Sequence, residues 1–145
     1  MYDNIDILLV EDNPADAELA IRALKNHNLH QRLHHVADGE QALDFLFCRG
    51  SYASRSNAKA PKVIFLDLKI PKVGGLEVLR LIKEDPKTQR IPVVVITSSN
   101  QDPDADTAYE LGANGYVVKP VGFEDFIKAI SDTGLFWLHV NEAPR

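Results

Sequence analysis

Short apolar runs alternate along the chain with segments whose apolar residues recur at helical spacing. Each apolar run is too short for a helix and is typical of a buried β-strand. The first, IDILLVED, predicts a strand over Ile5 to Val10, and RLHHVA predicts a second near Leu33. KVIFLD, IPVVVITS and GYVVKP predict three more.

The segments between and after these runs predict five helices. The first has Asn13 as its cap, Pro14 in its first position and Asp16 in its first turn. The others are DGEQALDFLF, GGLEVLRLIKED, DADTAYELGAN and GFEDFIKAIS, and Gly112 is expected to end the fourth in a left-handed conformation. Strict alternation of strands and helices predicts an α/β, doubly wound parallel sheet with helices on both faces.

The composition limits both the size of the fold and its partners. With 145 residues, 45% hydrophobic and 26% charged, the chain can bury one core, and we expect a single domain over residues 1–145. The net charge of -5, without a Lys/Arg stripe, disfavours direct binding to nucleic acid or anionic lipid. A single cysteine, Cys48, and the absence of a run of about 18 apolar residues favour a cytoplasmic protein outside the membrane.

Residues 48–62, CRGSYASRSNAKAPK, interrupt the alternation. The segment is polar and long for a connection between a helix and a strand. We expect a mobile surface loop, and we favour a tolerated insertion over a partner-binding role.

The tail GLFWLHVNEAPR, residues 134–145, follows a helix that should already have ended. Its dense apolar residues are costly to leave in water, because burial of each contributes about 1.5–3 kcal/mol. We expect a homodimer in which the fifth helix and tail pair about a two-fold axis, with Phe136 and Trp137 as anchors. In the alternative, the tail folds back onto its own domain.

Four of the five predicted strands end in polar residues. In chain order these are Glu11 and Asp12, then Asp67, then Thr97 with Ser98, and finally Lys119. The carboxyl ends of parallel strands share one edge of an open sheet, and ligands bind there. We therefore expect these side chains to lie close together.

This set of groups indicates phosphoryl chemistry. Three crowded carboxylates repel one another unless a cation neutralises them, and oxygen ligands favour Mg²⁺, which often works beside phosphate. Asp67 can attack phosphorus to give an acyl phosphate, while Lys119 and the Thr97 hydroxyl contact the phosphoryl oxygens.

Four stretches, LLVEDNPADAEL, VIFLDLKIPKVGGLEVL, PVVVITSS and GANGYVVKPV, have the motifs, order and spacing of a known family. Over residues 5–131 the chain resembles a response-regulator receiver domain. The resemblance implies a flavodoxin-like sheet with strand order 2-1-3-4-5 and Asp67 as the phosphoacceptor. It also implies that Glu11 and Asp12 hold Mg²⁺ and that Thr97 and Lys119 sense the phosphate.

The same resemblance assigns three further features. The backbone carbonyl of Lys69 would be the remaining protein ligand of the metal, and Lys119–Pro120 would be a cis peptide bond. Tyr116 would occupy the position of the switch aromatic, although a structural tyrosine is an equally good reading of a half-buried strand. The Lys69 side chain is a departure, because the family often has a small or amide side chain there.

Within the family, LHHVADGEQALDFLF with its long following loop and the ending FWLHVNEAP resemble single-domain regulators associated with bacterial and cyanobacterial phytochromes. This finer resemblance implies a histidine kinase of the phytochrome type as partner and no output domain after Arg145. It implies a phosphoacceptor with at most intrinsic autophosphorylation and autodephosphorylation, rather than an enzyme.

Two other classes of protein share parts of this pattern. A haloacid-dehalogenase-type phosphatase also uses an Asp nucleophile, Mg²⁺ and Lys, but places a second aspartate where this chain has Lys69. A flavodoxin-like FMN module would need a phosphate loop after the first strand, where the acidic EDNPAD repels phosphate. The neighbouring His34 and His35 lack a nearby cysteine or third ligand, so we expect ordinary strand or surface histidines.

Overall fold

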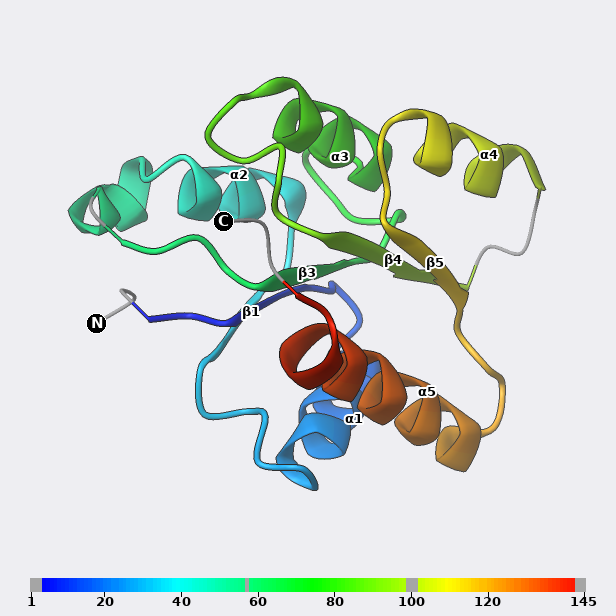
Figure 1. The fold of residues 1–145 in the computed structure, drawn as a ribbon. Helices are drawn as coiled ribbons and strands as arrows, with labels where there is room; N and C mark the ends of the chain where they lie inside the picture. Colours follow the sequence, from blue (N-terminus) through cyan, green and yellow to red (C-terminus); the bar gives the residue numbers. More distant parts are fainter. Residues whose placement is uncertain (1–3, 57, 99–101, 143–145) are drawn as a thin grey trace.

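A computed structural model describes residues 4–56, 58–98 and 102–142 of the chain. Its centre is a parallel sheet of five strands (Figure 1). The strands are β1 (Ile7–Val10), β2 (Leu33–Val36), β3 (Val63–Leu66), β4 (Val93–Thr97) and β5 (Gly115–Val118). They lie in the order β2-β1-β3-β4-β5, which confirms the predicted topology.

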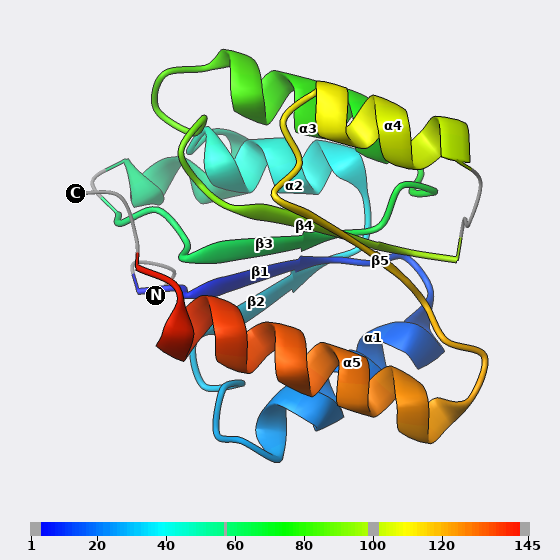
Figure 2. The same ribbon diagram turned by 45° about the vertical axis from the view of Figure 1, so that its right-hand side comes forward.

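Helices cover both faces of this sheet, as predicted. Figures 1 and 2 show α2 (Gly39–Leu46), α3 (Gly75–Glu84) and α4 (Asp102–Glu110) on one face. The opposite face carries α1 (Pro14–Lys25) and α5 (Phe123–Leu135), which lie side by side. None of the helices in the described part of the chain is long and apolar enough to span a membrane.

Local sequence explains how the helices begin and end. The side chain of Asn13 accepts hydrogen bonds from the backbone N–H groups of Ala15 (3.0 Å) and Asp16 (3.1 Å), and Pro14 opens α1 as expected. Gly112 has φ +105° just after α4, which is the left-handed geometry predicted for it. The central strands β1, β3 and β4 are fully buried, so two cores form, one on each face of the sheet.

The fifth helix is longer than the sequence predicted. It continues to Leu135 and then into a π-helical turn, η2 (Phe136–Val140). Leu135, Trp137 and Leu138 pack against the core beneath α1 and α5, so burial of these side chains favours continued helix. The tail thus folds back onto its own domain, while Phe136 remains 45% exposed and Val140 67% exposed. Residues 143–145 of the predicted extension lie outside the described residues.

The loop after α2 also differs from the prediction. Residues Gly50–Arg55 form a 3₁₀ helix, η1, and Arg55 at its end is only 3% exposed. The Arg55 guanidinium lies 3.7 Å from the centre of the Phe45 ring and donates to the Phe45 carbonyl. The His34 ring stacks on Phe45 and lies 2.9 Å from the Tyr52 hydroxyl. This part of the loop is a docked element, where the sequence predicted a mobile one.

Replacing Arg55 by Met should therefore destabilise the domain. Loss of a buried charged donor and of its contact with the Phe45 ring should lower the free energy of unfolding by about 2–4 kcal/mol. Arg22→Met is the matched control, because Arg22 makes an exposed ion pair with Glu18, worth less than about 1 kcal/mol. Urea unfolding of both variants measures the difference, and equal losses would show that η1 is not held by Arg55.

Candidate functional site

The register of the sheet brings the polar strand ends to one edge. Strands β1 and β3 end in register at Val10 and Leu66, and β4 and β5 end in register at Thr97 and Val118. Backbone hydrogen bonds continue one residue further, from Asp67 N–H to the Val10 carbonyl (3.1 Å) and from Lys119 N–H to the Thr97 carbonyl (2.7 Å). The predicted cluster at the carboxyl edge is therefore formed.

The Lys119 ammonium is the centre of this cluster. Its Nζ lies 2.6 Å from Glu11 Oε1, 2.8 Å from Asp16 Oδ2 and 3.0 Å from Asp67 Oδ2. The side chains of Lys119, Glu11 and Asp67 are each less than 10% exposed, so these interactions act with little screening by water. Thr97, on the strand between β3 and β5, is fully buried.

Burial and charge shift the pKa values of two of these groups. Burial is the main cause that raises the pKa of Glu11; the hydrogen bond from Lys119 lowers it, the Asp67 charge raises it, and the net pKa is about 7. For Lys119, burial lowers the pKa, but hydrogen bonds to Asp16, Glu11 and Asp67 outweigh it and raise the pKa above its usual range. The lysine is thus charged, and it compensates only part of the negative charge around it.

The remaining negative charge fits a divalent cation. Glu11, Asp12 and Asp67 each offer a carboxylate oxygen, and these oxygens lie within 4.8 Å of one another. Ligands on opposite sides of one Mg²⁺ are about 4.2 Å apart, twice the length of an Mg–O bond, so the three groups are near the spacing that one ion needs. Asp12 is exposed, which leaves the site open to water and to a phosphoryl group.

The turn after β3 keeps the backbone close to Asp67. The Lys69 N–H donates to Asp67 Oδ1 at 3.3 Å, and the Gly75 N–H donates to the Leu68 carbonyl at 2.9 Å. A Cβ at Gly75 would lie 2.4 Å from the Leu68 Cα, so only glycine permits this approach. The Lys69 side chain is exposed at the rim of the site.

The predicted cis bond between Lys119 and Pro120 is wrong for this structure. No peptide bond among the described residues is cis. Trans is the lower-energy form of an X–Pro bond by about 0.5–1 kcal/mol. Lys119 already reaches its three carboxylate partners with the trans bond, so its contacts do not require the cis form.

The other predicted residues lie outside the carboxylate cluster. Tyr116 is half-buried on β5 and packs against the core beneath α2, α3 and α4. Phe136 and Trp137 contact each other edge to face, with ring centres 5.2 Å apart, at the far end of α5 from its first turn. The structure does not bring the tail together with the pocket.

Two residues at the carboxyl edge were missed by the sequence analysis. Asp16 bonds to Lys119, and the Asn13 N–H donates to Glu11 Oε2 at 3.2 Å. Both were interpreted only as signals for the start of α1. Because α1 begins directly after the acidic pair, its first turn faces the pocket, and this placement could have suggested the role of Asp16.

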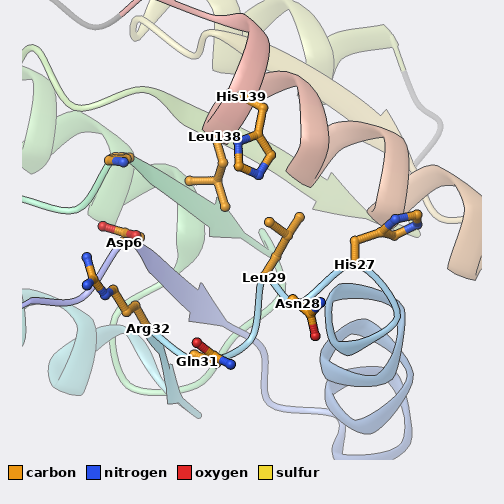
Figure 3. Close-up of a pocket in the computed structure, with 9 residues that line it drawn as sticks. Asp6, His27, Asn28, Leu29, Gln31, Arg32, Leu138 and His139 are labelled. Carbon is orange, nitrogen blue, oxygen red and sulfur yellow. The ribbon is translucent and has the colours of Figure 1, made fainter.

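A second hollow, of about 350 Å³, lies at the opposite edge of the sheet (Figure 3). Asp6 and Arg32 line one side of it, His27 lies across from them, and His139 enters from η2. Lys62 adds a further positive charge. Asp6 is the one carboxylate among the described lining residues. Among the described residues, the acidic side chains spaced to share one metal ion lie at the carboxyl edge and not in this hollow.

Comparisons with known proteins find a matching family and similar structures. The sequence profile of the response regulator receiver domain family matches residues 7–131. The response regulator Rcp1 of Synechocystis sp. is 40% identical over 138 residues, which cover 95% of this chain and 92% of that protein. The structure of the Mn²⁺-bound form of Rcp1 matches with a TM-score of 0.88, covering 96% of this chain and 98% of that chain at 40% identity.

Two further solved structures are similar. The phosphorylated cyanobacterial phytochrome response regulator RcpA matches with a TM-score of 0.89 at 39% identity, covering 96% of this chain and 97% of that chain. The bacteriophytochrome response regulator AtBRR matches with a TM-score of 0.73 at 50% identity, covering 94% and 96%.

Asp12→Ala should weaken Mg²⁺ binding by roughly tenfold or more. Replacing a group that only orients a metal ligand already lowers metal affinity by about 10–100-fold, and Asp12 is itself a proposed ligand. The metal-free fold should be unchanged or more stable, since one repelling carboxylate is removed. Calorimetric titration with Mg²⁺ and urea unfolding without metal measure the two effects. Asp132→Ala, on the exposed surface of α5, should leave both unchanged; an Asp12→Ala variant that binds Mg²⁺ as the parent protein does would exclude this ligand set.

Proposed function

The chain belongs to the response regulator receiver domain family, and from this premise we propose that it accepts a phosphoryl group on Asp67 and then changes conformation. One observation carries the proposal. Asp67 stands at the carboxyl edge of the sheet, hydrogen-bonded to Lys119 and within 4.8 Å of the acidic pair Glu11 and Asp12.

In the proposed reaction, an Asp67 carboxylate oxygen attacks phosphorus. The new O–P bond forms as the bond from phosphorus to the donor's histidine nitrogen or acetate oxygen breaks, and the donor leaves with that electron pair. Lys119 moves from Asp67 to a phosphoryl oxygen, and the Thr97 hydroxyl donates to another. These two side chains thereby sense the phosphate.

We propose Mg²⁺ as the cofactor, held by Glu11, Asp12, Asp67 and the backbone carbonyl of Lys69. The carboxylate oxygens support this choice, and the Lys69 N–H, which donates to Asp67, keeps the Lys69 backbone beside the site. When bound, the ion reduces the negative charge of the carboxylates and of the phosphoryl oxygens. The Mn²⁺-bound structure of Rcp1 supports a divalent ion in a related protein.

We infer that Thr97 and Tyr116 carry the change of conformation. Movement of Thr97 toward the phosphoryl group would vacate space beside β5, into which Tyr116 can turn. The surface of α4, β5 and α5 would then change, and a partner could distinguish the two states. The half-buried position of Tyr116 supports this role, because the ring can move without losing a fully buried site.

A histidine kinase of the phytochrome type is the proposed phosphoryl donor. RcpA and AtBRR carry phytochrome in their names, and both match over more than nine-tenths of this chain. We place the reaction in the cytoplasm. Receiver domains are not enzymes in the usual sense, and we propose that this one has at most intrinsic autophosphorylation and autodephosphorylation.

The two alternative hypotheses, a dehalogenase-type phosphatase and a flavodoxin-like FMN module, have less support. Lys69 stands where a dehalogenase-type phosphatase needs its second aspartate, and the acidic residues after β1 would repel a flavin phosphate. The family match favours the receiver over both.

Phosphorylation of Asp67 should be visible by intact mass. Incubation with acetyl phosphate and Mg²⁺ should add one phosphoryl mass to the parent protein and none to Asp67→Asn, because the amide lacks the nucleophilic carboxylate. Asp132→Asn, an exposed carboxylate on α5, should label as the parent does. Full labelling of Asp67→Asn would show that another residue is the acceptor.

We propose that the tail also forms a homodimer. The two-fold interface would contain α5 and η2, with Phe136 and Trp137 as anchors. Phe136 and Val140 are exposed, while Trp137 is half-buried and contacts Phe136, so an apolar surface remains for a second copy.

Light scattering across a concentration series measures this assembly. The parent protein should dimerise at micromolar concentration, and Phe136→Ser should raise the dissociation constant by roughly tenfold or more, because it removes one apolar anchor from each of the two copies. Val121→Ser, at a fully exposed position before α5, is the control and should dimerise normally. A parent protein that stays monomeric at high micromolar concentration, with and without a phosphate mimic, would exclude the dimer.

A further inference from the structure

The ring of His35 bonds to the backbone beside the acidic pair. His35 lies on β2, next to β1 (Figure 2), and its Nε2 is 2.7 Å from the carbonyl oxygen of Glu11. A carbonyl oxygen can only accept, so the proton of this hydrogen bond is on Nε2. The donor exists in both the neutral ring and the imidazolium, so the contact does not depend on the charge of His35.

Strand β2 thereby holds both peptide groups of Glu11. The Glu11 N–H donates to the Val36 carbonyl at 3.0 Å, and the Glu11 carbonyl accepts from His35. The planar peptide that contains this carbonyl also contains the backbone nitrogen of Asp12. Its orientation fixes the positions of the Asp12 nitrogen and Cα, from which the exposed Asp12 side chain extends.

The neighbouring histidine provides an internal comparison. Successive residues of a strand point to opposite faces, and His34 contacts Phe45 and Tyr52 in the core around α2 and η1. His34 therefore supports the loop, while His35 supports the carboxyl edge. The two adjacent rings have separable roles.

We propose that His35 is a positioning residue for the divalent-metal site: by fixing the Glu11–Asp12 peptide, it keeps the Asp12 carboxylate within reach of an ion shared with Glu11 and Asp67. This inference rests on the proposed function, which requires that ion. Among the described residues, the backbone N–H and carbonyl of Glu11 both form their hydrogen bonds with residues of β2.

Mg²⁺ titration of metal-free variants tests the proposal. His35→Leu removes the donor and should weaken Mg²⁺ binding by about tenfold, within the range measured for groups that orient metal ligands. His35→Gln places an amide N–H at the same number of bonds from Cβ and should restore binding to within about threefold of the parent protein. His34→Gln should leave the Mg²⁺ affinity unchanged while lowering the stability of the loop.

A second comparison separates positioning from general damage to the fold. In an Asp12→Ala background, His35→Leu should have no further effect on Mg²⁺ affinity, because the side chain that it positions is gone. Equal weakening in both backgrounds, equal weakening by Leu and Gln, or parent-like binding by His35→Leu would each overturn the proposal.

Nuclear magnetic resonance of the parent protein gives a test that needs no variant. The His35 ring should carry its proton on Nε2 and show a scalar coupling through the hydrogen bond to the Glu11 carbonyl. An Nδ1–H tautomer would overturn the inference, even if His35→Leu does not fold. If the parent protein itself does not bind Mg²⁺, both the proposed function and this inference are wrong. If the parent protein binds Mg²⁺ and the His35 variants bind it equally well, only the role of His35 is wrong.

Discussion

The ammonium group of Lys119, held among three carboxylates, is the interaction on which the carboxyl edge depends. It directly follows the last strand of the sheet and bonds to Glu11 after the first strand, to Asp67 after the third and to Asp16 on the first helix. Without this cation, the buried carboxylates would repel one another and be difficult to keep ionised. One side chain thus joins segments more than 100 residues apart in the sequence.

This arrangement is possible because the sheet is parallel and its strands end nearly in register. Strands β1, β3 and β5 then deliver the residues that follow them to the same edge, and β4 delivers its last residue, Thr97. Two of the connections that follow are held locally: the Asn13 side chain caps α1, and Gly75 brings the start of α3 against the turn after Asp67. The rigid sheet sets the distances, and the loops supply the oxygen atoms.

The sequence was sufficient for the sheet, its helices and the strand-end cluster, because these depend on local periodicity and on a general property of parallel sheets. It was not sufficient for features that depend on tertiary packing. The end of α5 was predicted too early, since Leu135 and Leu138 gain burial only by packing against the core on the α1 and α5 face of the sheet. The docking of η1 was missed because an arginine in a sequence is expected to be exposed. Arg55 is buried only because its guanidinium packs on the Phe45 ring, a tertiary contact. Asp16 looked like a helix-start residue, and only the position of Lys119 gives it another role.

The sheet separates two cores that share backbone but few side chains. Residues packed beneath α2, α3 and α4 belong to one core, and those beneath α1 and α5 to the other. In the described part of the long connection containing η1, Arg55 and Tyr52 pack against the first core. Changes in the length of this connection therefore need no repacking of the helices on the opposite face. The fold can therefore accept insertions on the face that carries α2, α3 and α4, while the packing on the face that carries α1 and α5 stays unchanged.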